Sequence, residues 1–290
     1  QGSGRQRAHY RKVGAAAVRA EGRPILHLDL AEYKGRDADS GVKVPHLRIL
    51  IGAHESGITA CVPIRTKTTK DLLTATRDLI MILEQHYGMP LINRIHSDDE
   101  SGIHKDPNFK EEMAERAIRL TVCPGFGAAK AESAIARLAG KARSIIQDLP
   151  ISSALQPLVW PYLMMYVANA EARIKIHKMD PTSKLAAITR PQPKFFQTVL
   201  IPTGAKTRTA PRFMRAVYMA SAPNRTMGHH VIPITADKHK RPSIKSVITV
   251  EMVKPIVTGS GSPHHTENIT VATGTRKDQQ LKNGDLNDYE

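Results

Sequence analysis

Three acidic side chains lie where strands and a helix would bring carboxylates together. Asp29 falls within an alternating run, Asp98 follows a short apolar run, and Glu132 opens an amphipathic stretch. Crowded carboxylates repel one another and resist ionisation, and a divalent cation removes that penalty. Hard oxygen ligands of this kind suit Mg²⁺ or Mn²⁺. Two such ions activate a nucleophile and stabilise the leaving oxygen when a phosphodiester is attacked. Asp29, Asp98 and Glu132 are therefore candidate catalytic metal ligands.

Each of these acids also has an ordinary structural explanation. Glu132 is equally explained as a charge that complements the helix dipole in a first turn. Asp29 is also explained as a structural hydrogen-bond acceptor, although an acid within LHLDL is costly to bury unless it is paired. Asp98 stands beside Asp99 and Glu100, and acids are common in solvated turns. The residues alone leave both explanations open for each acid.

Other familiar catalytic patterns do not occur in this sequence. No GxxxxGK[ST] phosphate-binding loop and no GxSxG nucleophile elbow is present. His96 and His104 would suit a metal site, but spaced histidines in a basic loop are more often solvated. The acids therefore carry the chemical hypothesis.

The first acid lies in a segment with strong strand character. Residues 25–33 alternate, so that Leu26, Leu28 and Leu30 would face a core while Asp29 lies on the other face. Two further β-rich runs, 46–53 and 57–64, are separated by a short turn, which suits a hairpin. We expect three successive strands in an antiparallel meander.

The other two acids lie in a segment that alternates between helices and strands. The expected elements are a helix from Thr68 or Thr69 to about Gln85, a strand over 91–97, a helix over 108–117, a strand over 118–122 and a helix over 128–147. This order describes a mixed sheet, antiparallel first and then parallel through helical crossovers. If the first and fourth strands are neighbours and the last helix packs across the sheet, the three carboxylates meet.

The helix expected over 128–147 has two distinct faces. Its apolar stripe comprises Ala131, Ile135, Leu138, Ala142, Ile145 and Ile146. Lys130, Arg137 and Lys141 share another face, with Arg143 beside it. We expect the apolar side to pack on the sheet and the basic side to meet DNA.

The rest of the chain divides into segments of different character. A basic lead-in over 1–22 precedes a core over 23–180, which ends in a helix over about 158–176. A polar linker over 181–193 leads to several short β-like runs over 194–258, which suggest a small β-barrel or sandwich. Residues 259–290 contain few large apolar side chains, so we expect disorder there.

The charge of the chain points to a polyanionic partner. The formal net charge is +15 over 290 residues, and residues 190–258 carry twelve Lys or Arg against two acids. Nucleic acid is the commonest partner of such a surface, although a basic solvated surface is the simpler alternative. Arg212 and Arg215 in this segment, like Lys67 before the second helix, are candidate DNA contacts.

The composition also bears on the cellular compartment. The two cysteines are too few for a disulfide framework and favour a reducing environment. No run of about 18 apolar residues and no hydrophobic signal core occurs, so we expect a soluble intracellular protein without a membrane partner. KHKR over 238–241 is either a nuclear import signal or a solvated loop.

Four segments resemble the catalytic core of retroelement integrases, particularly those of copia-type retrotransposon Pol polyproteins. LHLDLAEY is similar to the family's first-aspartate strand, PIRTKT to its strand-to-helix lysine segment, and IHSDDESG to the segment that holds the second aspartate. AKAESAIARLAGKARSII resembles the family's catalytic-glutamate helix at several offsets. The likeness covers about residues 20–255.

This resemblance carries specific expectations about fold and function. It implies an α/β, RNase H-like mixed five-stranded sheet flanked by helices, followed by a small Src-homology-3-like β-barrel domain. It implies that Asp29, Asp98 and Glu132 hold two Mg²⁺ or Mn²⁺ ions. It also implies a polynucleotidyl transferase that cleaves double-stranded DNA and joins element ends to target DNA, as a homo-oligomer in the nucleus.

The sequence departs from the family pattern beside two of the acids. Asp99 and Glu100 replace the Asn-Gly that follows the second aspartate, and Ala128 and Ala129 stand where Asn-Gly precedes the glutamate helix. The family has a zinc-binding His/Cys domain upstream of the core, and of its ligands only a histidine, His9, remains in that region of this chain. We therefore expect a fragment or a degraded copy. Two alternatives follow: an inactive DNA-binding derivative, and a cut-and-paste transposase of the same fold.

Overall fold

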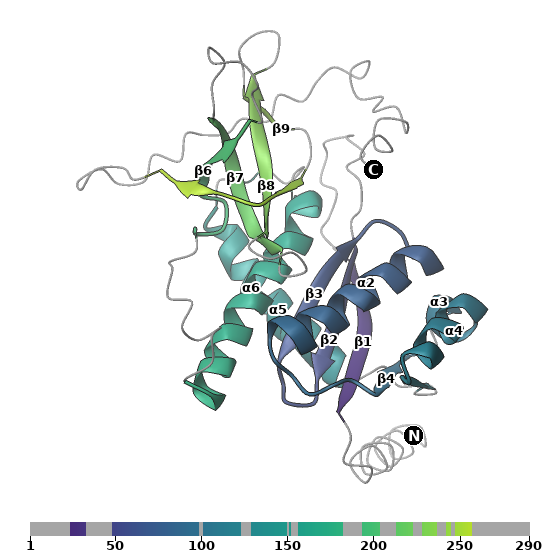
Figure 1. Cartoon of the computed structure of the whole chain (residues 1–290). Coiled ribbons are helices and arrows are strands. Elements are labelled where there is room, and N and C mark those ends of the chain that lie inside the picture. The colour runs from purple at the N-terminus through teal and green to yellow at the C-terminus, as the bar shows by residue number, and fades with distance from the viewer. Residues whose placement is uncertain are drawn as a thin grey trace, which may run out of the picture.

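The structure is a computed structural model of the whole chain, shown in Figure 1. It describes residues 24–32, 48–98, 101–122, 129–149, 151, 156–181, 193–203, 213–222, 228–236, 242–244 and 247–256. The expected lead-in, nearly all of the linker and the expected disordered tail lie outside these residues, as does Arg212. All structural statements below concern the described residues.

The first sheet has five strands in the order β3-β2-β1-β4-β5. Its strands are β1 (Ile25–Glu32), β2 (Arg48–His54), β3 (Thr59–Ile64), β4 (Arg94–Ser97) and β5 (Arg119–Val122). The first three strands form an antiparallel meander, while β4 runs parallel to both β1 and β5. The first and fourth strands are neighbours, which is the condition that the meeting of the acids requires. This mixed sheet with flanking helices fits the RNase H-like arrangement.

Alternation along the strands divides the core between the two faces of this sheet. Leu26 and Leu28 pack with apolar residues of the helix that follows β3. Ala31, Ile49 and Ile51 pack on the other face with the helix that contains Glu132. Because successive side chains in a strand point to opposite faces, Asp29 shares the face of Ala31.

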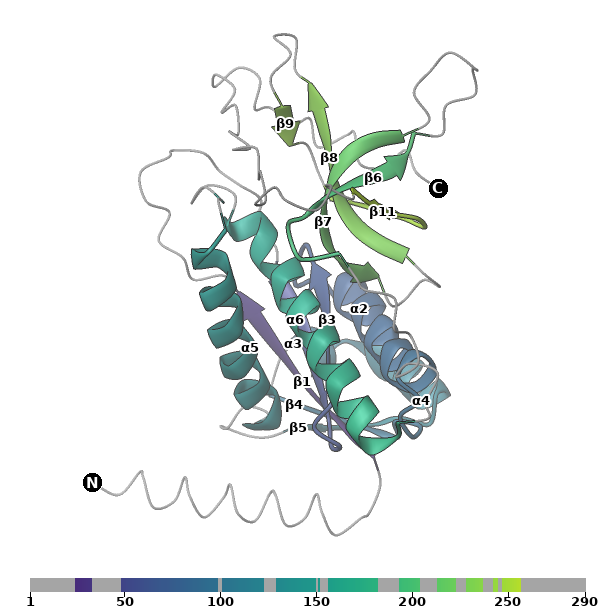
Figure 2. The ribbon, with the colours of Figure 1, turned by 90° about the vertical axis from the view of Figure 1, so that its left-hand side faces the viewer.

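Helices cover both faces, as Figure 2 shows. They are α2 (Thr69–Met81), continued by a π-helical turn η1 (Ile82–His86), then α3 (Ser101–His104), α4 (Pro107–Glu115), α5 (Ala129–Gln147) and α6 (Gln156–Met179). The Thr68 side chain caps α2 and the Asp106 side chain caps α4, which satisfies backbone N–H groups at each start. No helix among the described residues is both long and apolar enough to span a membrane.

Two elements around β4 differ from the sequence-based expectation. β4 begins at Arg94 rather than Leu91, because the Ile92 N–H donates to the Glu84 carboxylate at 2.6 Å instead of a strand ladder. The short helix α3 was not expected at all. Four residues are too few to show a helical period in a sequence.

The second sheet contains six strands in the order β10-β8-β7-β6-β11, with β9 paired to β8. They are β6 (Thr198–Pro202), β7 (Phe213–Ala222), β8 (Gly228–Ala236), β9 (Pro242–Ile244), β10 (Ile248–Val250) and β11 (Lys254–Pro255). All of their pairings are antiparallel. The β-rich character of this segment is confirmed, whereas a Src-homology-3-like barrel stays a prediction.

Helix α6 joins the two sheets into one packed body. Val217 and Met219 of β7 belong to the same buried cluster as Leu138 of α5 and Leu163 of α6. The buried amide of Asn169 accepts a hydrogen bond from the Tyr87 hydroxyl at 2.8 Å and donates one to the Ser221 carbonyl at 3.3 Å. Both sheets therefore share one core through α6.

Candidate active site at the edge of the central strands

Two of the three predicted carboxylates lie level with each other on neighbouring parallel strands. The pairing of β1 with β4 ends at His27 opposite His96. Continuing this register by two residues sets Asp29 opposite Asp98, which directly follows β4. Neighbouring strands lie about 4.8 Å apart, so this register brings the two backbones close. Both side chains are half-buried.

The residues that precede Asp29 and Asp98 are in contact on one sheet face. The rings of His27 and His96, each two residues before its acid, meet edge to face with centroids 5.4 Å apart. The Asp29 Oδ1 atom accepts the Leu30 N–H at 2.7 Å. A strand in which side chains alternate then places Asp29 and Asp98 on the face that α5 covers.

Glu132 lies in the first turn of α5, as the sequence predicts, and its side chain is exposed. Helix α5 packs over β1 and β2 through Ala131, Ala134 and Leu138. Among the described residues, however, no three His, Cys, Asp or Glu side chains gather closely enough to hold a metal ion. The carboxylate donors suit Mg²⁺, but the three-ligand site is not assembled here, and the ligand set stays a prediction.

A buried serine and histidine adjoin the second acid. Ser97 is fully buried, and its Oγ atom lies 2.6 Å from His104 Nε2 and 3.1 Å from the Asp98 carbonyl oxygen. His104 is only 8% exposed. The expectation of a solvated histidine at this position is therefore wrong, because α3 turns the imidazole inward. The sequence analysis did not predict α3, the short helix that carries His104.

Three histidines line the junction between β1, β2, β4 and the start of α5. Burial, followed by the nearby His96, Lys130 and His54 side chains, lowers the pKa of His27 to about 3. Burial also lowers the pKa of His54 and of His96. Neither ring nitrogen of His27 has a hydrogen-bond partner among the described residues. The imidazole of His27 is therefore neutral at physiological pH.

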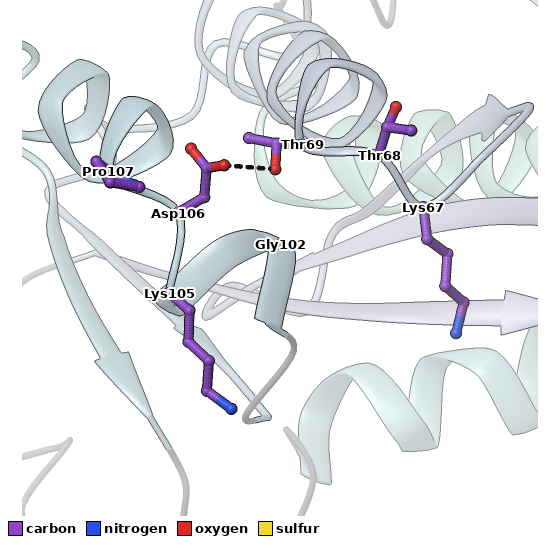
Figure 3. Close-up of a pocket in the computed structure, with 7 residues that line it drawn as sticks. All are labelled: Lys67, Thr68, Thr69, Gly102, Lys105, Asp106 and Pro107. Atoms are coloured by element: carbon purple, nitrogen blue, oxygen red, sulfur yellow. Dashed lines mark hydrogen bonds between the residues drawn. The ribbon is translucent and has the colours of Figure 1, made fainter.

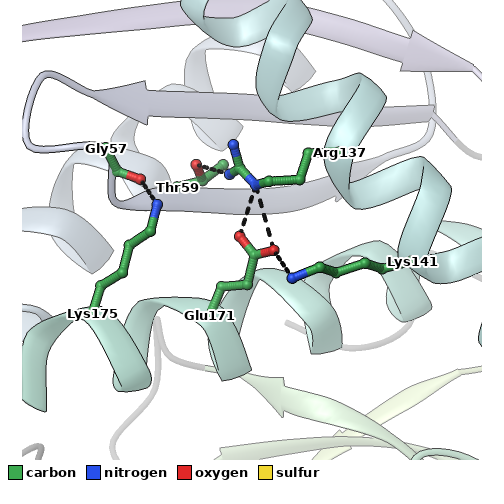
Figure 4. Close-up of polar contacts among 6 residues, drawn as sticks. All are labelled: Gly57, Thr59, Arg137, Lys141, Glu171 and Lys175. Carbon is green, nitrogen blue, oxygen red and sulfur yellow. Dashed lines mark hydrogen bonds and ion pairs between the residues drawn. The ribbon is translucent and has the colours of Figure 1, made fainter. Parts of the chain in front are cut away.

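Two cations of the predicted DNA-binding face have carboxylate partners within the chain. Figure 4 shows Arg137 and Lys141 of α5 meeting Glu171 of α6. The Arg137 Nε–Glu171 Oε2 distance is 3.0 Å, and the Lys141 Nζ–Glu171 Oε1 distance is 2.6 Å. Arg137 also donates to the Thr59 hydroxyl at 3.2 Å. Part of the basic face is thus turned toward α6.

The other predicted DNA contacts are distributed over the molecule. Lys130 lies 3.4 Å from Glu55 in the turn after β2. Arg143 and Arg215 are exposed, and Arg143 donates to a carbonyl one helical turn back, that of Ala139, at 3.3 Å. The structure therefore spreads these cations over α5 and β7, and their contact with DNA stays a prediction.

Lys67 lines a pocket of about 560 Å³ between the starts of α2 and α4. Figure 3 shows Lys67 and Lys105 extending to the same side, away from the hydrogen bond between Thr69 and Asp106. The Lys67 ammonium also lies 3.5 Å from Glu32 at the end of β1. Lys67 thus stands beside the strand that carries Asp29.

Comparisons with known proteins return retroviral integrases. The HTLV-2 integrase catalytic core domain in complex with magnesium, in dimeric form, is 16% identical over 46% of this chain and 79% of its own, with a TM-score of 0.31. The simian T-cell lymphotropic virus intasome in complex with the PP2A regulatory subunit B56 gamma is 12% identical over 81% of each chain, with a TM-score of 0.35. The BIV integrase catalytic core domain is 10% identical over 55% of this chain and 84% of its own, with a TM-score of 0.32.

TM-scores between 0.31 and 0.35 do not indicate what this chain does. No protein-family model matches the chain. No curated protein matches it either. The assignment to copia-type elements stays a prediction from the sequence segments, and the function must be argued from the sheet and its carboxylates.

Proposed function

We propose that this chain is the core of an integrase-type polynucleotidyl transferase that cleaves and joins DNA with the help of divalent metal ions. One observation supports the proposal: β1 and β4 are adjacent parallel strands in a mixed five-stranded sheet, and their register, continued two residues past His27 and His96, sets Asp29 level with Asp98 just after β4. Neighbouring carboxylates repel each other, and a divalent cation bound between them offsets that repulsion. The segment resemblances and the net charge of +15 support the same function.

The proposed roles follow from the positions of the side chains. Asp29 and Asp98 would hold Mg²⁺ or Mn²⁺ from the sheet, and Glu132 would complete the set from α5. Two bound ions would activate a water or a 3′-hydroxyl and stabilise the leaving oxygen. Lys67 and the exposed cations of α5 would hold the phosphate backbone. Double-stranded DNA, a homo-oligomeric assembly and a nuclear location belong to this proposal.

A strand-transfer assay tests the proposal with labelled duplexes that carry the element's terminal repeats. The intact chain is expected to give product in Mg²⁺ or Mn²⁺ and none in chelator. Asp29→Asn, Asp98→Asn and Glu132→Gln should each lower the rate by roughly a hundredfold or more, as for loss of a group that stabilises transition-state charge. Glu115→Gln, an exposed acid of α4, is the matched control.

The opposite outcome is equally clear. Metal-independent product that survives Glu132→Gln would exclude this function. Product that is metal-dependent but insensitive to Asp29→Asn would place the metal site elsewhere.

A second candidate function is DNA binding without catalysis. It is favoured by the absence of an assembled three-ligand metal group among the described residues and by the exposure of Glu132. This candidate predicts duplex binding that weakens steeply with salt and no nicking in Mn²⁺. Any clear Mn²⁺-dependent nicking abolished by Asp98→Asn removes it.

A further inference from the structure

We infer that His104 is a positioning residue, which holds the backbone of Asp98 through the hydroxyl of Ser97. The inference rests on the proposed function, because it gives His104 a role only if Asp98 is a metal ligand. Its basis is a chain of close contacts that runs from α2 through α3 to the end of β4. The central contact, between Ser97 and His104, is between buried groups, where a lost hydrogen bond is costly.

The hydroxyl of Ser97 determines the direction of the hydrogen bonds. A serine hydroxyl has one hydrogen to donate and two lone pairs that accept. The Ser97 Oγ donates to the Asp98 carbonyl at 3.1 Å. With that hydrogen given to the carbonyl, we assign the 2.6 Å contact to His104 Nε2 as a hydrogen bond that the histidine donates. His104 therefore carries a hydrogen on Nε2.

This arrangement orients the peptide group that follows Asp98. Its carbonyl oxygen accepts from Ser97, and β4 has ended one residue earlier, so Asp98 lies just beyond the residues that pair with β5. Fixing the carbonyl restricts the backbone dihedrals of Asp98 and hence the direction of its Cβ. A carboxylate that must face Asp29 across the strand gap needs such a restriction.

His104 is itself held by close packing of α3 on α2. A Cβ atom on Gly102 would lie 2.6 Å from Leu72 Cδ1, so a larger residue there would require the Leu72 side chain to shift. Ile103 is 2% exposed and packs in the same cluster as Leu72. The neighbouring Thr69 hydroxyl donates to Asp106 at 2.8 Å, which ties the start of α2 to the start of α4. The imidazole thus projects from a short, well-packed helix.

The Ser97–His104 pair is not a nucleophile with its base. A catalytic serine gives its proton to a histidine that accepts it, and its oxygen must reach substrate. Here the histidine donates, the serine gives its hydrogen to a backbone carbonyl, and Ser97 is fully buried. The pair is built to hold a conformation.

The test compares His104→Leu, His104→Gln and Ser97→Ala with the intact chain. Leucine keeps much of the volume but cannot donate, while the glutamine amide can replace the Nε2 donor. His86→Leu removes another half-buried histidine, next to Tyr87, and serves as the matched control. Mn²⁺ binding is measured by titration calorimetry, together with the thermal midpoint and the affinity for a DNA duplex.

The expected result is a selective loss of metal affinity. His104→Leu and Ser97→Ala should weaken Mn²⁺ binding by about 10- to 100-fold, as for removal of a group that orients a ligand. DNA affinity should change less than about threefold, and His104→Gln should recover most of the Mn²⁺ affinity. His86→Leu should leave Mn²⁺ binding unchanged.

Two contrary outcomes are distinguishable. If the intact chain binds Mn²⁺ and the His104 and Ser97 variants lose only thermal stability, the positioning role is wrong while the proposed function stands. If the intact chain binds no Mn²⁺ and cleaves no DNA, the proposed function fails and the role of His104 fails with it.

Discussion

At the residue scale, His27 is a buried base beside the candidate site. Its ring packs edge to face on His96, and neither nitrogen has a hydrogen-bond partner among the described residues. The titratable groups that oppose a proton on it are His96, Lys130 and His54, from β4, α5 and β2. A proton on His27 would therefore meet burial and like charge together.

Acid should destabilise the chain because of this histidine. The folded pKa of His27 is about 3, below the ordinary value of 6.5, so the unfolded chain binds a proton that the folded chain refuses. The contribution of His27 to the free energy of unfolding is fully present above pH 6.5. Below pH 6.5 this contribution falls by about 1.4 kcal/mol per pH unit until about pH 3. His54 and His96 shift in the same direction.

Replacement of His27 by phenylalanine tests this dependence. Phe keeps the ring contact with His96 and removes two unpaired nitrogens, so stability at pH 7.5 should be equal or higher. Urea unfolding at pH 7.5 and pH 5.5 should show about 1 kcal/mol less acid loss in His27→Phe than in the intact chain. An unchanged loss would mean that His27 is protonated in the folded chain.

At the element scale, α5 and α6 are joined by one carboxylate that serves two cations. Burial raises the pKa of Glu171, but hydrogen bonds and charge from Lys141 and Arg137 outweigh this and hold it below its usual value. Lys175, one turn along α6, donates to the Gly57 carbonyl before β3. The predicted DNA-binding face of α5 thus doubles as a helix–helix contact.

Glu171→Gln should trade stability for DNA affinity. The free energy of unfolding should fall by about 1 kcal/mol or less, because the contacts that are weakened join one mostly buried carboxylate to two cations that are 38% and 55% exposed. Arg137 and Lys141 become available for phosphate, so the slope of log K against log salt should steepen by up to about 1.8. Fluorescence anisotropy with a duplex from 50 to 200 mM salt measures it, with Glu111→Gln on α4 as control. An unchanged slope would show that these cations do not reach DNA.

At the scale of the whole molecule, the two sheets behave as parts of one core. Val217, Met219 and Ile232 of the second sheet pack against α5 and α6. The boundary between a core over 23–180 and a β-domain over 194–258 is therefore crossed by apolar packing, and by the hydrogen bonds of Asn169.

Removal of the second sheet should destabilise the first. A chain that ends at Asp180 would expose apolar side chains of α6, such as Leu163, that β7 now covers. Scanning calorimetry should show one transition for the intact chain and a lower midpoint for the shortened chain. Removal of residues 259–290 alone, which takes away none of the described contacts, is the control. An equal midpoint in the chain that ends at Asp180 would make the two sheets independent.

The sequence by itself determined the elements and their faces. Alternation placed β1 and its inward leucines, the three- and four-residue spacing placed α5 with Glu132 in its first turn, and Thr68 marked the start of α2. These features are local, since a strand or helix period is written in adjacent residues. The types and positions of Asp29, Asp98 and Glu132 made them candidate metal ligands, and the resemblance of the segments that hold them implied the same set.

Only the tertiary structure decided which residues meet. Ser97 and His104 are seven residues apart and show no period, and Glu171 reaches Arg137 from 34 residues away. The second sheet shares its core with α6 because apolar surface on both must be covered, and no local pattern states the partner. Contact between distant segments depends on the order of strands in the sheet and on the fit of packed side chains. Both depend on residues throughout the sequence and not on any local pattern.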